Sequence, residues 1–221
     1  MQIKKRDILA VYYQDLTGNR NGHMLSHLQF TTQCQRAIED LSSIQPSVAS
    51  VLDKADLSHA RLYEELVSSQ RQLDARAGND AVGPEWLWRE FESADELIVG
   101  SIGLSSRQGI PIHDHPGSSG ILLVFSGSVE VTQYQADPGS GGQRMTELEV
   151  LRHQRYEIGD YVRFTESEGN IHSLQGSHRD CLLLDILVFP YRLNERRWYL
   201  PANTPERRAG QRVKTLLMKK P

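Results

Sequence analysis

The feature that most constrains the fold is a series of short apolar or alternating segments after residue 84, each separated from the next by turn residues. The segments span residues 97–104, 121–125, 129–134, 148–151, 161–165 and 181–188. The turns between them fall at 105–109, 126–127, 137–142, 159–160 and 175–180. Short strands at fairly regular spacing are typical of a β-sandwich or β-barrel. We therefore expect this part of the chain to be mainly β.

Residues before about position 80 have a different pattern. In residues 56–77, leucines recur at helical spacing among Glu and Arg residues, which predicts an amphipathic helix that packs on something. These leucines are Leu62, Leu66 and Leu73. A shorter helix is predicted at 32–41, and residues 78–84 form a loop rich in Gly, Asn, Asp and Pro. We therefore divide the chain into an N-terminal helical arm, 1–80, and a β domain, 81–221.

Composition excludes several classes of protein. Of the 221 residues, 38% are hydrophobic and 24% are charged, which fits one globular domain with an appendage. A net charge of -3 and a pI near 6.2 provide no general positive field, so we expect no nucleic-acid partner. The Arg and Lys residues that follow Asn194 are expected to form a solvated terminal segment rather than a docking patch.

The chain shows no sign of export. No apolar run approaches the roughly 18 to 20 residues of a membrane helix, and the apolar stretch at 8–13 is too short for the core of a signal peptide. Cys34 and Cys181 are the two cysteines, so no disulfide framework is expected, and free thiols suit a reducing compartment. We expect an unprocessed, soluble, cytoplasmic monomer.

Paired histidines in the β part are the first sign of a chemical site. The segment Gly-Ile-Pro-Ile-His-Asp-His-Pro-Gly-Ser-Ser-Gly, residues 109–120, precedes an apolar run that ends at Gly127. On a strand, His113 and His115 would face the same side and Asp114 the other. Imidazole is a ligand for iron, copper, nickel and zinc. A lone His-x-His pair is weak evidence for a metal, because such histidines are often surface or core residues.

The surrounding residues resemble the first motif of the cupins, in which Gly precedes His-x-His, a Glu follows and a Gly closes the strand. Gly127 stands at the closing position, and Gly120 stands where the Glu is expected. The second cupin motif supplies a third histidine, and residues 168–172 match it, with Ser167 in place of the usual Pro. The resemblance implies a jelly-roll β-barrel with N-terminal helices, and His172 as the third ligand.

The glycine at position 120, in place of the usual Glu, favours one group of cupins over the others. Most metal-binding cupins use three His and one Glu, whereas the thiol dioxygenases use three His and have Cys or Gly where the Glu was, which leaves room for a thiolate. Three neutral imidazoles also leave Fe(II) with more positive charge than a site that includes a glutamate carboxylate. That charge favours coordination of an anionic, soft thiolate.

Three segments resemble the cysteamine dioxygenase and plant cysteine oxidase family. They are Ile-Pro-Ile-His-Asp-His-Pro-Gly at 110–117, Gly-Asn-Ile-His at 169–172 and Asp-Ile-Leu-Val-Phe-Pro-Tyr at 185–191. The likeness spans about residues 86–199 and departs from the family at Phe189, where a Pro is usual. Plain cysteine dioxygenases are similar over less of the C-terminal part and normally show His-x-Tyr at the place of residues 185–187.

The resemblance implies an enzyme that adds O2 to the sulfur of a thiol and gives a sulfinic acid. Its cofactor would be Fe(II), held by His113, His115 and His172. The implied substrate contains a 2-aminoethanethiol unit, whether cysteamine, cysteine or the N-terminal cysteine of a protein. The residues do not decide among the three. Asp185 and Tyr191 are implied at the active site.

Asp185 also stands out because it interrupts an apolar run, residues 181–188, that is typical of a buried strand. An isolated buried carboxylate is costly, so we expect it to be paired, to orient a ligand His or to hold the substrate amine. The alternative is an edge strand on which Asp185 faces water. For Tyr191 the alternative is a packing role with its hydroxyl bonded to the backbone.

Arg89 is a candidate substrate residue by resemblance to cysteine dioxygenases, which use an Arg upstream of the metal motif to bind the substrate carboxylate. A surface position is the alternative, because most arginines are exposed. An inward-facing Arg89 would favour free cysteine as the substrate.

Two other functions stay open. One is a different metal-dependent cupin enzyme that acts on a carbon substrate, although Gly120 argues against most of these. The other is a non-enzymatic cupin that binds a ligand and a metal, which predicts no thiol-dependent oxygen consumption. The fold alone does not separate them, because cupins carry many functions.

Overall fold

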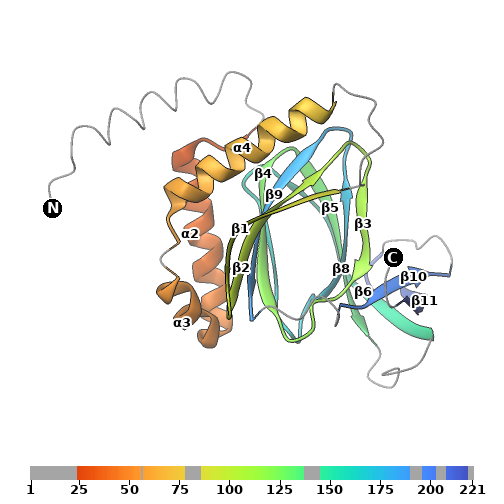
Figure 1. Ribbon diagram of the computed structural model, residues 1–221. Coiled ribbons are helices and arrows are strands. Elements are labelled where there is room, and N and C mark those ends of the chain that lie inside the picture. The colour runs from red at the N-terminus through yellow and green to blue at the C-terminus, as the bar shows by residue number, and fades with distance from the viewer. Residues whose placement is uncertain are drawn as a thin grey trace, which may run out of the picture.

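The computed structural model describes residues 24–55, 57–77, 86–136, 145–189, 196–202 and 208–218. These residues form two β-sheets with a layer of helices against one of them (Figure 1). The expected fold, a mainly β cupin jelly roll with N-terminal helices, is confirmed.

The helices precede the strands. They are α2 (His27–Ile44), α3 (Pro46–Lys54) and α4 (His59–Ala77). Ser26 begins α2 with a capping box, in which Ser26 and Gln29 exchange side-chain and backbone hydrogen bonds. The chain breaks at Gln45, and Pro46 begins α3, because proline lacks an N–H and fits the first turn of a helix. In the part of the chain that the structure describes, none of the helices has the length and apolar character needed to cross a bilayer.

The first sheet is antiparallel and has the order β1-β2-β9-β4-β7. Its strands are β1 (Trp86–Ala94), β2 (Leu97–Leu104), β9 (Cys181–Val188), β4 (Ser119–Ser126) and β7 (Tyr161–Phe164). The second sheet closes into a barrel in the order β10-β11-β6-β5-β8-β3. Its strands are β10 (Trp198–Pro201), β11 (Arg212–Met218), β6 (Met145–Glu157), β5 (Ser128–Ala136), β8 (Ile171–Gly176) and β3 (Gly109–His113).

Strands β4 and β9 are buried along their whole length, because both faces of the first sheet are covered. Successive side chains of a strand point to opposite faces. On β9, the residues that pack in one cluster with the helices are Leu182, Leu184, Ile186 and Val188. The residues that pack between the two sheets are Cys181, Leu183 and Leu187. A run that is apolar except at Asp185 is typical of a strand covered on both faces.

The helices lie against the first sheet (Figure 1), and the two layers share one hydrophobic core. The rings of Phe30 on α2, Tyr63 on α4 and Phe125 on β4 contact one another, with centroids 5.7 to 6.1 Å apart. Polar contacts join the same layers, since the Ser126 hydroxyl donates to Gln70 of α4. The division of the chain near residue 80 into an arm and a domain stays a prediction.

The C-terminal segment corrects one prediction. The residues after Asn194 were expected to be a solvated terminal segment, but β10 and β11 are strands of the barrel. Trp198 on β10 pairs with His113 on β3, and β11 pairs with β6. On β11, Val213 and Thr215 are buried, while the basic residues Arg212 and Lys214, which alternate with them, are exposed. The basic side chains therefore lie on the outward face of a strand. The alternation of basic and buried residues over 212–215 is the sequence pattern that indicates this strand.

We expect Leu41→Ala to lower the free energy of unfolding by about 2–5 kcal/mol, because this fully buried side chain of α2 would leave a cavity in the shared core. The matched control is Leu28→Ala on the same helix, where the side chain is 66% exposed and the change should stay within about 0.5 kcal/mol. Urea unfolding followed by tryptophan fluorescence reports on the β part, since all three tryptophans lie there. A Leu41→Ala protein with an unchanged fluorescence transition would contradict a shared core.

Candidate metal centre

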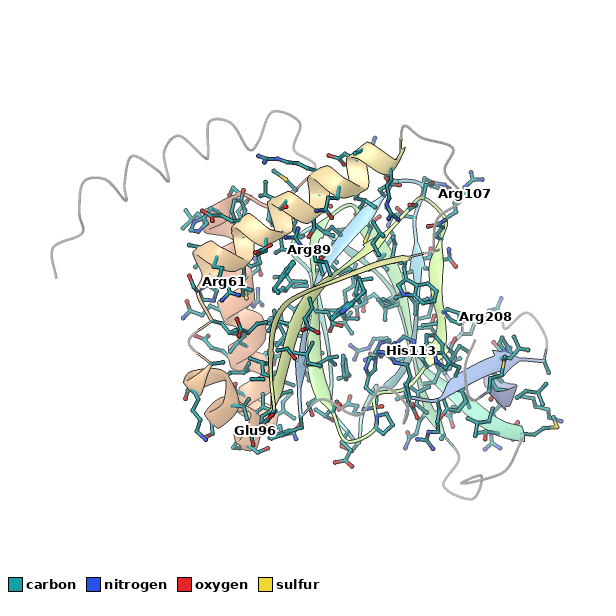
Figure 2. All side chains as sticks on the ribbon, viewed as in Figure 1. Arg61, Arg89, Glu96, Arg107, His113 and Arg208 are labelled. Carbon is teal, nitrogen blue, oxygen red and sulfur yellow. The ribbon has the colours of Figure 1, made fainter. Side chains whose placement is uncertain are left out.

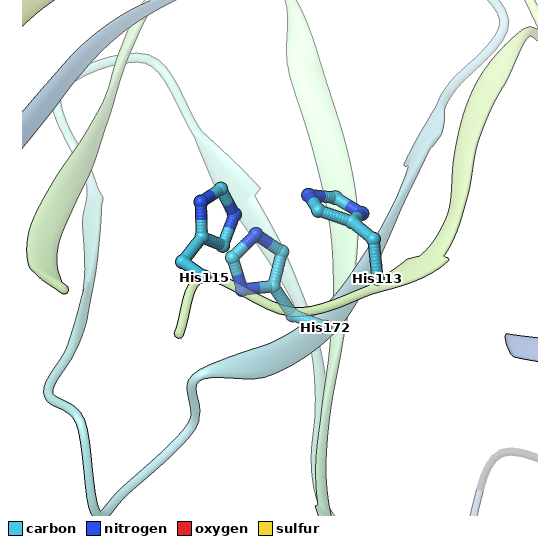
Figure 3. Close-up of side chains that lie close together, drawn as sticks. All are labelled: His113, His115 and His172. Atoms are coloured by element: carbon cyan, nitrogen blue, oxygen red, sulfur yellow. The ribbon is translucent and has the colours of Figure 1, made fainter. Parts of the chain in front are cut away.

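Three histidines, two on neighbouring strands and one in the loop after the first of them, converge between the sheets (Figure 3). His113 ends β3, His115 follows in the next loop, and His172 lies on β8 directly opposite His113. Their ring centroids are 4.7 to 4.9 Å apart. One ring nitrogen from each lies within 4.8 Å of the other two. The structure thus brings together the three histidines that the sequence predicts as ligands.

Burial keeps these imidazoles neutral. Desolvation lowers the pKa of His113 and His115 well below the usual 6.5. The other histidines of the cluster, each of which disfavours a second positive charge, and the nearby Arg196 lower it further. For His172, burial lowers the pKa to about 4. A neutral imidazole is the form that binds a metal ion.

Backbone carbonyls select the tautomer of two rings. Nδ1 of His113 lies 2.8 Å from the carbonyl oxygen of Pro111, and Nδ1 of His172 lies 3.4 Å from that of Gly169. A carbonyl oxygen only accepts, so each Nδ1 carries the proton and each Nε2 keeps its lone pair. An imidazole nitrogen binds zinc at about 2.1 Å, and two nitrogens on one ion are then at most about 4.2 Å apart. The ring nitrogens here, which lie within 4.8 Å of one another, approach that separation. Three imidazole nitrogens are suitable ligands for a divalent transition metal.

Asn170 clamps the segment that carries His115. Its Oδ1 accepts from the backbone N–H of His115 at 2.8 Å. Its Nδ2 donates to the backbone carbonyls of His115 at 2.7 Å and of Ser118 at 3.1 Å. Because Asn170 lies two residues before His172, these bonds join the two ligand segments. Asn170 lies between Gly169 and His172 in the second motif, and this position could have indicated a role in supporting the histidines.

Asp114 anchors the same segment from the other side. Its side chain is 1% exposed and points away from the histidines, as strand alternation predicts. The carboxylate accepts from Arg197 Nε at 2.5 Å, from the Arg197 backbone N–H at 2.8 Å and from the Tyr199 hydroxyl at 3.1 Å. These bonds attach the histidine loop to β10.

The position where other cupins carry Glu is filled by packing. A Cβ on Gly120 would lie 2.6 Å from Phe164 Cζ and 2.6 Å from the carbonyl oxygen of Ile186. The Phe164 ring packs on both His115 and His172, with centroids 5.1 Å apart in each case. An aromatic ring therefore occupies the space beside Gly120 where the sequence predicts room for a thiolate.

The histidines line a cavity of about 290 Å³ between the sheets. This volume is just below the usual range of ligand pockets, about 300–1,000 Å³. Most of the lining is apolar: Trp86, Ile98, Ile102, Ile110, Leu122, Phe164, Leu174 and Leu187. Trp88 and Glu90 of β1 line the cavity too and are exposed, so the cavity opens beside this edge strand.

Asp185 faces the cavity from β9. It is 4% exposed, and its Oδ1 has no hydrogen-bond partner among the described residues. Burial raises its pKa to about 7, against the opposing effect of the nearby Arg196 charge. Strand β9 lies between β2 and β4, which excludes the alternative of an edge strand with Asp185 in water.

Arg196 also lines the cavity, and sequence reasoning missed it because it placed this residue in the solvated terminal segment. Its guanidinium carbon lies 5.5 Å from the centroid of the Trp198 ring. That ring packs in turn against His113, with centroids 5.1 Å apart. In the sequence, the one indication of this position is that Arg196 lies two residues before Trp198, the first residue of β10.

Arg89 is labelled in Figure 2 on the side of β1 near α4, and it is not among the residues that line this cavity. It lies between β1 and α4, where Nη2 is 2.6 Å from Glu65 and Nη1 is 3.0 Å from the Ser68 hydroxyl. Alternation along β1 sends Trp86 and Trp88 to the cavity and Arg89 to the helices. The predicted contact with a substrate carboxylate has no support in this arrangement. Tyr191 lies outside the described residues.

We expect Asn170→Ala to weaken the binding of a divalent metal about 10- to 100-fold, because the backbone of His115 would lose its clamp. Gln175→Ala is the matched control, since this side-chain amide of β8 also donates to backbone carbonyls, those of Arg107 and Gln108. Competition with a chelator of known affinity measures the dissociation constants. Equal affinities for the two variants would contradict the role of Asn170.

Gly120→Ala should destabilise the protein by about 1–3 kcal/mol, because the new Cβ would collide with the backbone of β9 and with Phe164. Gly103→Ala on β2 is the control, since its Cβ would meet other atoms no closer than 3.4 Å and should change stability by less than about 0.5 kcal/mol. Urea unfolding of both variants tests this difference. A Gly120→Ala protein as stable as Gly103→Ala would show that Phe164 and β9 yield easily.

Comparisons with known proteins agree with the site. The family model for PCO_ADO matches residues 51–213, which is more than half of the chain. The 2-aminoethanethiol dioxygenase of Homo sapiens is 26% identical over 132 residues, which cover 49% of this chain and 48% of the human protein. The Mus musculus protein of the same name is 27% identical over 128 residues, covering 49% and 50%. The chain thus spans about half the length of these curated relatives.

Solved structures overlap this one partially. KdgF from Halomonas sp. is 16% identical, with a TM-score of 0.38 over 52% of this chain and 88% of that one. A cupin superfamily protein from Desulfitobacterium hafniense is 11% identical, with a TM-score of 0.36 over 50% and 83%. The family match is much more extensive. The chain therefore belongs to the PCO_ADO family, the cysteamine dioxygenase and plant cysteine oxidase family that its histidine segments resemble.

Proposed function

We propose that this chain is a non-haem, Fe(II)-dependent thiol dioxygenase. One observation carries the proposal: in a member of the PCO_ADO family, three buried, neutral imidazoles converge on the wall of a small, mostly apolar cavity. The similarity to the human and mouse 2-aminoethanethiol dioxygenases supports the same activity.

The proposed reaction converts R–SH and O2 to R–SO2H, so that both oxygen atoms end on sulfur. Fe(II) bound by His113, His115 and His172 would supply the coordination of a soft thiolate and the activation of O2. The carbonyls of Pro111 and Gly169 hold the tautomers of His113 and His172, and the apolar walls limit the access of water. The chain thus supplies ligands, orientation and a dry space.

We propose that Asp185 receives the amine of the substrate. Its Oδ1 is buried and without a partner among the described groups, so an ammonium group would provide the missing hydrogen bond. A cation beside the carboxylate would also favour its ionised form, against the effect of burial. A 2-aminoethanethiol unit has an amine two carbons from its sulfur, and cysteamine, cysteine and a protein N-terminal cysteine all share this unit. Tyr191 keeps its proposed catalytic role by resemblance alone.

We also propose a reducing compartment such as the cytoplasm, because Cys34 and Cys181 are buried free thiols. A monomer stays the predicted oligomeric state.

The decisive test is anaerobic loading with Fe(II), followed by measurement of oxygen uptake with cysteamine, L-cysteine and a peptide that begins with Cys. We expect uptake with at least one thiol, formation of its sulfinic acid and loss of both in His172→Ala. The control is His153→Ala, whose imidazole contacts Thr132 at 2.9 Å and lies outside the cavity lining. If the protein binds iron but consumes no oxygen with any of the three thiols, the proposal is wrong and another cupin reaction is favoured.

A further inference from the structure

Three aromatic rings form a continuous stack that leads away from the histidine cluster. Trp198 of β10 packs on His113, with ring centroids 5.1 Å apart and an angle of 35° between the rings. Trp86 of β1 packs on Trp198, with centroids 6.2 Å apart and an angle of 29°. Both separations lie in the range of direct aromatic contact, about 4.5–7 Å. The stack therefore joins a proposed metal ligand to the edge strand of the first sheet.

The stack runs from the interior toward water. His113 is 3% exposed and Trp198 is 8% exposed, whereas Trp86 is half-buried. The third tryptophan of the chain, Trp88, lines the same cavity and is 43% exposed. Its ring packs on no other aromatic ring of the described residues. Two tryptophans thus belong to the stack, and one lies beside it with greater exposure.

Indole rings in such a stack can pass single electrons. Indole is among the most easily oxidised side-chain groups, whereas the ring of Phe164, which packs on His115 and His172, resists oxidation. Electron transfer between two rings slows steeply as the distance between them grows. Two short steps through Trp198 are therefore much faster than one long step between Trp86 and the cluster.

The charge of Arg196 makes the two indoles unequal. Its guanidinium carbon lies 5.5 Å from the centroid of the Trp198 ring. A cation is attracted to a neutral aromatic ring but repels the radical cation that remains when the ring loses an electron. Trp198 is therefore harder to oxidise than Trp86, which is also close enough to water for the indole proton to leave. An electron vacancy on Trp198 consequently moves outward to Trp86.

We propose that Trp198 and Trp86 carry oxidising equivalents away from the metal centre when O2 reacts there without a thiol. The inference rests on the proposed function, because it requires a bound iron that reacts with O2. Without a thiol, no sulfur receives the oxygen atoms, and the oxidant formed from O2 takes electrons from the nearest oxidisable groups. The imidazole ligands are among these groups. Oxidation of an indole in their place preserves the three histidines.

Each transfer moves one electron. Trp198 gives an electron to the oxidant derived from O2, Trp86 gives one to Trp198, and the Trp86 radical cation releases its indole N–H proton to water. A soluble thiol restores Trp86 by giving one electron and one proton, and two of the resulting thiyl radicals combine to a disulfide. Where no such reductant is present, the Trp86 radical reacts with O2 and retains oxygen.

The test maps the oxygen that the full chain retains after its Fe(II)-loaded form has reacted with O2 in the absence of any thiol. Peptide mass spectrometry assigns the added oxygen to individual side chains. We expect more on Trp86 than on Trp88, although Trp88 is the more exposed, and little on the three histidines. Zn(II), which has no redox chemistry, is the metal control and should give no more than the metal-free protein. Oxidation in the order of exposure, with Trp88 first, or none on Trp86, would overturn the proposal.

Variants separate the stack from exposure. Trp198→Phe should abolish the oxidation of Trp86 above the Zn(II) level and move added oxygen to the histidines, because phenyl keeps a ring there but resists oxidation. Trp86→Phe leaves the contact between Trp198 and His113 in place and should move the oxidation to Trp198. Trp88→Phe makes the same change beside the stack and should leave the oxidation of Trp86 unchanged. Unchanged oxidation of Trp86 in Trp198→Phe, or its loss in Trp88→Phe, would overturn the path. Circular dichroism of each variant confirms that it is folded.

Sulfinic acid formation from a thiol, measured separately, distinguishes this inference from the proposed function. Thiol oxidation by a protein whose tryptophans are oxidised in the order of exposure would support the function and overturn the path. Oxidation of Trp86 that depends on Trp198, without sulfinic acid from any thiol, would support the path and overturn the thiol dioxygenase.

Discussion

The cover of helices over the first sheet is the constraint on which the other features depend. Because α2, α3 and α4 keep one face of this sheet dry, alternate residues of β4 and β9 anchor the strands in the helix core. The residues between them are then held rigidly toward the other sheet. Asp185 owes its position to this arrangement, since Leu184 and Ile186 on either side of it are buried on the helix side. A buried carboxylate without a partner for Oδ1 persists where the strand around it is fixed in this way.

The geometry of the histidine cluster depends on residues that do not belong to it. Asn170 joins the two ligand segments through the backbone of His115, and Asp114 ties the loop between His113 and His115 to β10. Without such supports, a loop residue such as His115 would sample many positions, and a metal would have to meet the entropic cost of ordering it. The supports approach the loop from opposite sides, so its orientation is fixed before any ligand binds.

The sequence predicted the strongly patterned parts well. Strands β2 and β9 match their predicted ranges, because a run buried on both faces is mostly apolar. The helix predicted at 56–77 matches α4 within a few residues. The three histidines were predicted because their spacing is a motif. Strand β11 was missed because its outward face is basic. Arg196 was missed because its place at the cavity depends on a tertiary contact with Trp198. Asn170 was missed for the same reason, since its partners are 52 to 55 positions away. Arg89 shows the converse limit, because similar spacing in the sequence did not fix which face of β1 it occupies.

The contact between Gly120 and Phe164 bears on how the site can change over evolutionary time. A carboxylate side chain at position 120 is a single base change away, because changing the middle base of a glycine codon from G to A gives an aspartate or a glutamate codon. In this chain that step meets the Phe164 ring and the Ile186 carbonyl, and the ring is itself packed on two of the histidines. A viable path to a four-ligand site therefore begins with a smaller residue at position 164, a change that also loosens His115 and His172. A fourth ligand at position 120 therefore requires changes at several contacting residues together, which favours a site with the three proposed histidine ligands.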